Sequence, residues 1–394
     1  MDVPIPRLLL SVFCLLVISC GPKDPQPEPI LSSSTKVGFY SNAALKTLTT
    51  SNDSLVYKPS NYEVTVHRVV YKTTLEDGTR ITASGVVFVP KQLSPTTKPY
   101  PLLSYQHGTA FSSGDALSNS NLAIAAFSYP LLYATYGYIV ACPDYIGYGE
   151  ARRQLPHRYE HRQTLAQATV DMLLATQELL VKEGVKSSTQ TFLTGYSEGG
   201  YASLSAQKLI EEKYTDKIKL AGSSCGAGPY AMSAFFDYVT HKSTVGGIAN
   251  QIYAWQTLSY NSTYNVNKPI SYYFKSPYAE QIGFSLDNAR KITVSFDKIC
   301  TDAFRAEVQD KASVFGKALA DNDLIDWSTQ TPTRLIHSQQ DEIIPYLATQ
   351  QVYAALTKSG SKKLNLVSFK TGYHVPIDVI SIRRSLEWFQ SLRE

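Results

Sequence analysis

A serine between two glycines ends an apolar run in the middle of the chain. Ser197 has Gly195 and Gly199 two residues to either side, after the strand-like segment 191–194 and before a helical pattern at 201–213. Tight turns from a strand into a helix raise such a hydroxyl above a sheet, and they need glycines because neighbouring backbones come close. The pattern alone also arises by chance, so these flanking elements decide its interpretation. We therefore take the Ser197 hydroxyl as a candidate nucleophile.

An acid and a histidine that could activate this hydroxyl follow later in the chain. Asp341 is the first acidic residue after the predicted strand 333–337, and His374 lies in the loop after the last predicted strand, 363–369. An aspartate can accept a hydrogen bond from one ring nitrogen of a histidine while the other nitrogen faces the serine. We expect Asp341 to fill this role, and the neighbouring Glu342 is the alternative acid.

A glycine-containing loop follows another predicted strand, at 101–106. The loop begins with His107, Gly108 and Thr109, and a glycine there lets a backbone N–H group face a reacting carbonyl. We expect the oxyanion of such a reaction to lie between the backbone N–H groups of Glu198 and Thr109. His107 is interpreted as a residue that shapes this loop, because a histidine at a strand end is more often structural than catalytic.

The order of serine, aspartate and histidine along the chain is that of the α/β-hydrolases. The motifs that accompany it are YQHGT at 105–109, PDYIGYG at 143–149, GYSEGG at 195–200, and the loops D-x-x-x-P at 341–345 and H-x-P at 374–376. From about residue 61 onward the chain resembles the α/β-hydrolases, and it is similar to the secretory lipase family and its bacterial lipoprotein esterase relatives. The resemblance implies an α/β fold with an eight-stranded, mostly parallel central sheet flanked by helices. It also implies an inserted, largely helical cap and the hydrolysis of carboxylic esters.

The first 36 residues are predicted to lie outside this fold. Arg7 precedes the apolar stretch 8–18, which is shorter than the roughly 20 residues of a membrane-spanning helix. The sequence VISC that ends at Cys20 resembles the lipobox of bacterial lipoproteins, so we predict a signal peptide at 1–20 and a lipidated Cys20. Ordinary secretion with a free cysteine is the alternative. The proline-rich segment 21–36 is predicted to be a tether, which implies a membrane-anchored lipoprotein in the periplasm or at the cell surface.

The rhythm of strands and helices predicts two core segments, 37–228 and 328–394, with a cap inserted at 229–327. Such an insertion lies over the carboxyl edge of an open α/β sheet, where ligands bind. The cap segment is rich in Tyr, Phe and Trp, which suggests apolar acyl chains or aromatic esters as substrates. Packing of the cap's own small core accounts for most of these rings.

Composition and charge exclude several classes of protein. A chain of 394 residues that is 43% hydrophobic and 18% charged is neither disordered nor fibrous. The formal charge is only +4, and Lys and Arg are scattered, so no nucleic-acid partner is expected. If Cys14 leaves with the signal peptide and Cys20 carries lipid, Cys142, Cys225 and Cys300 remain. Three cysteines allow at most one disulfide.

A basic loop between residues 152 and 162 carries His157 and His161 among four arginines. The histidines could suggest a metal site, but neighbouring arginines would repel a cation. We interpret the segment as a solvated loop at the rim of a pocket, and we expect no metal site.

Together these features predict a serine carboxylic-ester hydrolase that works through an acyl-enzyme without a metal or an organic cofactor. Its partners would be a small-molecule ester substrate and, through Cys20, a membrane; the number of subunits stays open. Two alternatives remain. One is a peptidase or acyltransferase on the same fold, and the other is a glycan-binding lipoprotein that keeps an inactive hydrolase fold.

Overall fold

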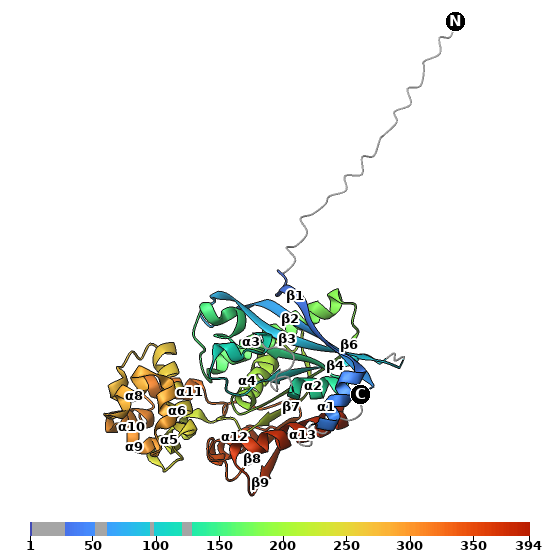
Figure 1. The fold of residues 1–394 in the computed structure, drawn as a ribbon. Helices are drawn as coiled ribbons and strands as arrows, with labels where there is room; N and C mark the ends of the chain where they lie inside the picture. Colours follow the sequence, from blue (N-terminus) through green and yellow to red (C-terminus); the bar gives the residue numbers. More distant parts are fainter. Residues whose placement is uncertain (2–27, 52–60, 95–97, 120–127) are drawn as a thin grey trace.

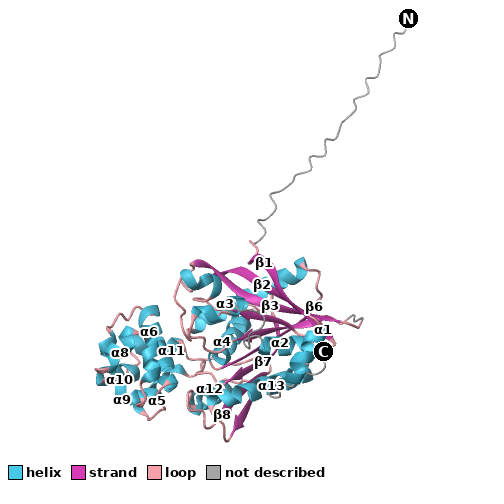
Figure 2. Cartoon of the chain, in the orientation of Figure 1, coloured by secondary structure: helices cyan, strands magenta, loops and turns pink. Residues whose placement is uncertain are grey.

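The strands in the described part of the chain form one nine-stranded sheet, with helices packed around it (Figures 1 and 2). The computed structural model describes residues 1, 28–51, 61–94, 98–119 and 128–394. Residues 2–27, which hold most of the predicted signal peptide, Cys20 and the start of the predicted tether, lie outside the described residues.

The sheet is mostly parallel, as the sequence predicts. Its strands are β1 (Leu31–Tyr40), β2 (Tyr62–Thr74), β3 (Arg80–Gln92), β4 (Tyr100–Gln106), β5 (Ile139–Pro143), β6 (Ser187–Tyr196), β7 (Lys219–Gly226), β8 (Thr333–Ser338) and β9 (Leu364–Phe369). Their spatial order is β1-β2-β3-β5-β4-β6-β7-β8-β9. The pairs β1–β2, β2–β3 and β3–β5 are antiparallel, and the remaining five pairs are parallel.

The first strand corrects two predictions. The expected eight strands and the expected tether up to residue 36 are both wrong, because β1 already begins at Leu31. Most β1 side chains are exposed at the sheet edge, so the segment lacks the apolar alternation that reveals a half-buried strand. The backbone N–H groups of Ile30 and Leu31 donate to the Glu178 carboxylate at 3.0 and 2.8 Å, which ties β1 to α3 (Arg162–Lys182).

Helices cover both faces of the sheet. The other core helices are α1 (Asn42–Ser51), α2 (Ser128–Thr135), α4 (Glu198–Lys213), α12 (Tyr346–Lys358) and α13 (His374–Leu392), with short 3-10 turns η1 (Ser113–Asp115), η2 (Leu117–Asn119) and η4 (Gly149–Arg153). Consecutive residues of β6 point to opposite layers: Phe192 packs on Phe389 of α13, and Leu193 packs with residues of α3 and α4. Among the described helices, none is long and apolar enough to cross a membrane.

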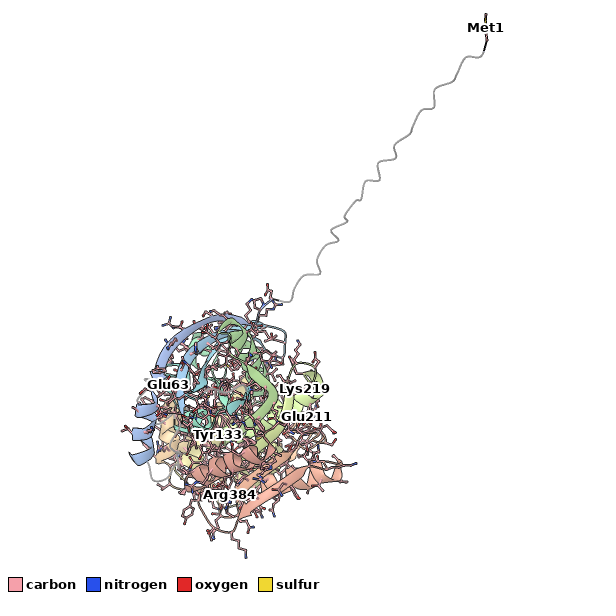
Figure 3. All side chains as sticks on the ribbon, turned by 90° about the vertical axis from the view of Figure 1, so that its right-hand side faces the viewer. Met1, Glu63, Tyr133, Glu211, Lys219 and Arg384 are labelled. Atoms are coloured by element: carbon pink, nitrogen blue, oxygen red, sulfur yellow. The ribbon has the colours of Figure 1, made fainter. Side chains whose placement is uncertain are left out.

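The layer that contains α2 and α13 is closely packed. Tyr133 of α2 lies within the core in Figure 3, and its hydroxyl donates to the backbone carbonyl of Ile382 at 3.2 Å.

The thiols of Cys142, Cys225 and Cys300 are buried and free. No disulfide therefore links these three cysteines.

A helical cap interrupts the core between β7 and β8. Its elements are α5 (Met232–His241), α6 (Ile248–Thr263), α7 (Ile270–Tyr273), α8 (Tyr278–Phe284), η5 (Leu286–Lys291), α9 (Phe296–Ile299), α10 (Asp302–Gln309) and α11 (Val314–Asp321). They form a bundle beside the core, at the left in Figure 1. Phe236, Tyr260, Tyr273 and Phe315 are fully buried and pack against one another there. These rings form the cap's own core, so they are unavailable to a substrate.

Candidate active site

Ser197 stands at the tight turn between β6 and α4. Its φ of +60° is unusual for a residue with a side chain. Two backbone hydrogen bonds hold this conformation: the Ser197 N–H donates to the Gly226 carbonyl at 2.9 Å, and the Tyr201 N–H donates to the Ser197 carbonyl at 3.0 Å. Strained backbone of this kind is found where the surrounding structure fixes a functional group. The turn therefore has the form predicted for a nucleophile elbow.

The glycines around Ser197 are required by close backbone contacts. A Cβ atom on Gly195 would lie 2.4 Å from the Gly199 carbonyl oxygen, and one on Gly199 would lie 2.1 Å from the Gln106 carbonyl oxygen. A third glycine has the same constraint, since a Cβ on Gly200 would lie 2.0 Å from the Gly226 carbonyl oxygen. No side chain fits at these distances, so the start of α4 can approach β4 and β7 only with glycines.

The three residues expected to form a triad meet in the structure. The Nε2 atom of His374 lies 2.9 Å from the Ser197 Oγ, and the Nδ1 atom lies 2.6 Å from the Asp341 Oδ2. All three residues are buried, with exposed fractions of 7 to 9%. Because the carboxylate can only accept, Nδ1 donates to Asp341, which leaves Nε2 to accept the serine proton.

Asp341 is held as an ionised acceptor. Its Oδ1 accepts backbone N–H groups from Ile343 at 3.0 Å and from Ile344 at 2.8 Å. Burial by itself would raise the pKa of Asp341, but hydrogen bonds from His337 and His374 outweigh it and hold the pKa well below its usual range. Asp341 is thus fixed in place and charged.

The alternative acid, Glu342, contacts a different part of the histidine. Its Oε2 accepts the backbone N–H of His374 at 2.8 Å, and the ring nitrogens of His374 are occupied by Ser197 and Asp341. Glu342 therefore supports the first residue of α13 rather than orienting the ring.

A second histidine, His337, contacts Asp341 and was not predicted from the sequence. His337 Nε2 lies 3.1 Å from the Asp341 Oδ2 and 3.0 Å from the Ile344 carbonyl oxygen, and its Nδ1 lies 2.6 Å from the Thr349 Oγ1. Its ring is fully buried. The signal in the sequence was a histidine directly after the apolar pair Leu335 and Ile336, four residues before the acid.

The two predicted oxyanion donors lie on elements that adjoin Ser197. Glu198 is the first residue of α4, directly after the serine. Gly108, in the loop after β4, is close enough that a Cβ there would lie 3.9 Å from the Ser197 Cβ. His107 Nδ1 contacts the Gly108 carbonyl oxygen at 2.7 Å, in agreement with its interpretation as a loop-shaping residue. The roles of the Glu198 and Thr109 N–H groups stay predictions.

The prediction that the basic loop at 152–162 is solvated is wrong for its two histidines. His157 and His161 are both buried. His157 Nε2 lies 2.6 Å from the Glu198 Oε1, and its Nδ1 donates to the Ile146 carbonyl at 2.7 Å. The side chain next to the nucleophile thus has a buried partner 41 positions earlier in the chain. Within the described ranges, no cluster of three or more His, Cys, Asp or Glu residues could hold a metal ion.

Comparison with known proteins assigns the chain to a family. A model of the secretory lipases matches residues 125–392, which is more than half of the sequence. The chain belongs to the secretory lipase family. A search of curated protein sequences gave no significant match.

Solved structures agree with this assignment. This member of the secretory lipase family is similar to the rice cell wall degrading esterase LipA from Xanthomonas oryzae, at 24% identity and a TM-score of 0.79 over 92% of this chain and 99% of that chain. A ligand-bound form of LipA gives 26% identity and a TM-score of 0.73, over 91% and 96% of the chains. Candida antarctica lipase A in its closed state gives 15% identity and a TM-score of 0.64, over 92% and 81%. The family supports an ester hydrolase of the esterase or lipase type, and the solved structures show the same fold.

In this member of the secretory lipase family, the cap contacts the loop after β4. Trp255 of α6 stacks on Tyr159, with ring centroids 4.4 Å apart and an interplanar angle of 6°. The Tyr159 hydroxyl lies 2.7 Å from the Thr109 Oγ1, and Phe111 packs 5.8 Å from the Trp255 ring. These contacts join the cap to the loop that passes Ser197.

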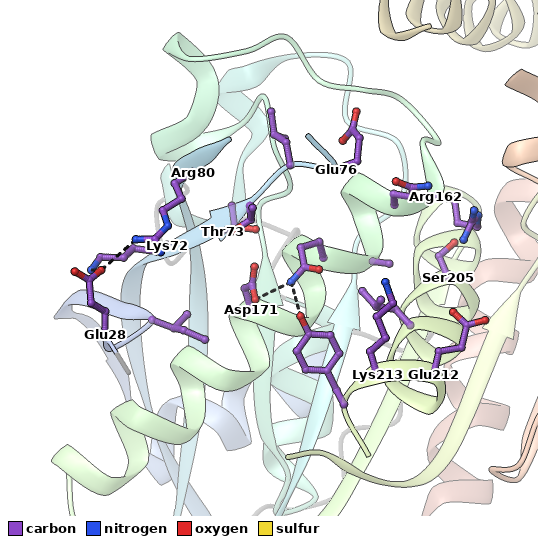
Figure 4. A pocket seen from close by; sticks show the side chains of 18 of the residues that line it. Glu28, Lys72, Thr73, Glu76, Arg80, Arg162, Asp171, Ser205, Glu212 and Lys213 are labelled. Atoms are coloured by element: carbon purple, nitrogen blue, oxygen red, sulfur yellow. Dashed lines mark hydrogen bonds and ion pairs between the residues drawn. The ribbon is translucent and has the colours of Figure 1, made fainter. Parts of the chain in front are cut away.

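A cavity of about 810 Å³ lies elsewhere, between β2, α3 and α4 (Figure 4). Charged side chains of both signs line it, and Glu28 pairs there with Lys72 at 3.1 Å. Asp171 also lines this cavity, and burial raises its pKa from 3.8 to about 6. None of the triad residues is among the lining residues.

Proposed function

We propose that the chain is a serine carboxylic-ester hydrolase in which Ser197, His374 and Asp341 form the catalytic triad. One observation carries the proposal: the His374 ring lies between the Ser197 Oγ at 2.9 Å and the Asp341 Oδ2 at 2.6 Å. A base within hydrogen-bond reach of the nucleophile, itself oriented by a buried acceptor, is the arrangement that acyl transfer requires.

The reaction proceeds by two acyl transfers. His374 Nε2 takes the Ser197 proton as the hydroxyl attacks the ester carbonyl, and Asp341 stabilises the imidazolium that forms. The same proton passes to the leaving alcohol, which departs as the acyl-serine forms. Water then gives a proton to His374 and attacks the acyl-serine, and the acid is released as Ser197 regains its hydrogen. His374 takes part in every proton transfer of both steps.

Backbone N–H groups of Glu198 and Thr109 are proposed to bind the oxyanion. Glu198 begins α4, where N–H groups at a helix start are free to donate. The loss of one such donor typically costs about 3 kcal/mol in the barrier. The buried contact between Glu198 and His157 would keep this peptide in a fixed orientation.

The expected substrates are esters with an apolar acyl chain or an aromatic group. Trp255 and Phe111 are not fully buried, and both belong to the aromatic contacts near Thr109. Rings that keep an accessible face can pack against an apolar group of a ligand. The rings inside the cap bundle do not contribute.

Hydrolysis of p-nitrophenyl esters from acetyl to palmitoyl tests this function. We expect turnover with a preferred chain length, and we expect Ser197→Ala and His374→Ala each to lower kcat by about ten-thousand-fold or more. Both variants should stay folded by circular dichroism. A folded protein without turnover on any ester would favour the amide-cleaving or glycan-binding alternatives instead.

The predicted lipid anchor is part of the same proposal. Lipid on Cys20, followed by a proline-rich segment, would hold the hydrolase at a bacterial membrane outside the cytoplasm. Its substrates would then be small-molecule esters that reach the membrane surface.

A further inference from the structure

We propose that His337 is a positioning residue that acts on the triad through Asp341. The inference rests on the proposed function and concerns a fully buried residue whose hydrogen-bond partners do not include Ser197. His337 and His374 both contact one oxygen of Asp341, the Oδ2, at 3.1 and 2.6 Å. His337 thereby fixes the direction of the carboxylate and limits how strongly it attracts the proton of His374.

The hydrogen-bond partners of His337 determine which of its ring nitrogens carries a proton. The Nε2 atom faces two groups that only accept, the Asp341 Oδ2 and the Ile344 carbonyl oxygen, at 3.1 and 3.0 Å. Nε2 must therefore donate, and it shares its hydrogen between both. Nδ1 lies 2.6 Å from the Thr349 hydroxyl, which can donate to it. A neutral ring with hydrogen on Nε2 satisfies every one of these contacts.

The surroundings hold this ring in one orientation. His337 lies on β8, Thr349 lies on α12, and the fully buried ring packs edge-on against Tyr346 at 5.5 Å. Asp341 in turn receives two backbone N–H groups on its other oxygen. A carboxylate with donors on both oxygens cannot rotate without losing hydrogen bonds.

Other titratable groups also act at this site. Those that face Asp341 or His374 from neighbouring elements are Tyr196, Tyr253, Glu342 and Asp378. Burial raises the pKa values of both tyrosines well above their ordinary value, so both stay protonated at neutral pH. Burial also raises the pKa of Asp378. The His337 contact is therefore one influence among several, and a difference measurement has to isolate it.

Loss of the His337 hydrogen bond has two expected consequences. Asp341 loses one of its fixed contacts, so the His374 ring is held less firmly and kcat falls by about 10- to 100-fold with KM little changed. Without the His337 donor, the Asp341 carboxylate also accepts a stronger hydrogen bond from His374. The stronger hydrogen bond favours the doubly protonated form of the His374 ring. The acid limb of the kcat/KM pH profile then moves to higher pH, by about half to one pH unit.

Two substitutions at His337 test these effects in the full-length protein. His337→Phe keeps a ring and removes both nitrogens, and His337→Gln keeps an N–H donor. We would measure kcat and KM on p-nitrophenyl acetate between pH 5 and 9, together with Tm. His337→Phe should show the lower kcat and the shifted acid limb, and His337→Gln should recover part of both.

A matched control separates positioning from stability. His161 is also buried, and its Nδ1 also lies 2.6 Å from a threonine hydroxyl, that of Thr164. His161→Phe should lower Tm without moving the acid limb. A wild-type kcat and acid limb in His337→Phe would overturn the inference, as would an equal shift in His161→Phe.

Two further variants cover the remaining outcomes. If His337→Phe does not fold, Thr349→Val removes the hydroxyl at Nδ1 and should shift the acid limb in the same direction by a smaller amount; an unchanged profile would overturn the inference. Ser197→Ala belongs in the same series. Turnover that persists in Ser197→Ala would contradict the proposed function, whereas its loss together with a wild-type His337→Phe would contradict only the role of His337.

Discussion

Asp171 is a buried carboxyl group outside the active site. It is 6% exposed, and its Oδ1 accepts a hydrogen bond from Gln167 at 2.9 Å. Burial raises its pKa to about 6, although the hydrogen bond from Gln167 opposes this shift. The native state therefore binds the Asp171 proton more tightly than the unfolded chain does. Between pH 3.8 and about pH 6, Asp171 is mostly protonated in the native state and mostly ionised in the unfolded chain.

This shift predicts a pH-dependent cost in stability. As pH rises through the window from 3.8 to about 6, the native state must lose the proton in a buried place, so folding is weakened by up to about 3 kcal/mol. Asp171→Asn does not ionise and should be about 1 to 3 kcal/mol more stable than wild type at pH 7.5. Below about pH 4 the two proteins should have similar stability.

Urea unfolding of both proteins at pH 4 and pH 7.5 measures this difference. Asp216→Asn, at an exposed position, is the control and should change stability little at either pH. A gain in Asp171→Asn that is equal at both pH values would contradict burial as its cause.

Single residues divide into those that the sequence reveals and those that it hides. Ser197 was predictable because close backbone packing demands glycines around it, and His374 because it follows the last strand. His337 and His157 were hidden, since their roles depend on side-chain partners. The partner of His337 lies four residues away across a turn, and that of His157 is Glu198, 41 residues away. Spacing along the chain does not encode such contacts.

At the scale of elements, the start of α4 depends on its contact with β7. Gly200 lies so close that a Cβ would be 2.0 Å from the Gly226 carbonyl oxygen. That carbonyl also accepts the Ser197 N–H at 2.9 Å. Because both partners are backbone, a new methyl group can be accommodated only by moving the helix away from the strand.

Gly200→Ala should therefore lower the free energy of unfolding by about 2 kcal/mol or more and reduce kcat. The matched change is Gly283→Ala in α8, where a Cβ meets no atom closer than 3.6 Å. There the loss of glycine's flexibility should raise stability by up to about 1 kcal/mol. Circular dichroism melts and ester turnover measure both effects. Equal Tm changes in the two variants would show that the contact with Gly226 is not what excludes a side chain.

Elements were predictable where burial leaves a pattern. β2 and β3 form an antiparallel pair. The side chains of β2 mostly alternate between buried and partly exposed positions, whereas β3 is a continuous buried run from 83 to 90. β1 was missed because most of its side chains face solvent at the sheet edge. The cap was expected from the interrupted rhythm after residue 228, but the sequence could not separate rings such as Tyr260, buried in the cap core, from Trp255, which contacts Tyr159.

For the whole molecule, the predicted anchor concerns residues outside the described structure. If Cys20 is lipidated, mass spectrometry of the protein expressed in a bacterium should find a mature chain that begins at Cys20 and carries acyl groups. The Cys20→Ala variant should no longer be found in the membrane fraction. Its kcat should equal that of the detergent-solubilised wild type. A mature N-terminus at another residue with an unmodified Cys20 would contradict the anchor and leave the proposed hydrolase unaffected.

The central claim is that Ser197 is the nucleophile, and covalent trapping tests it most directly. A fluorophosphonate probe phosphonylates an activated serine, so we expect one adduct per chain on the peptide that contains Ser197. Labelling should disappear in Ser197→Ala, slow by about a hundredfold or more in His374→Ala, and fail in heat-denatured protein. An adduct on another residue, or a Ser197→Ala variant that is labelled as fast as wild type, would contradict the account.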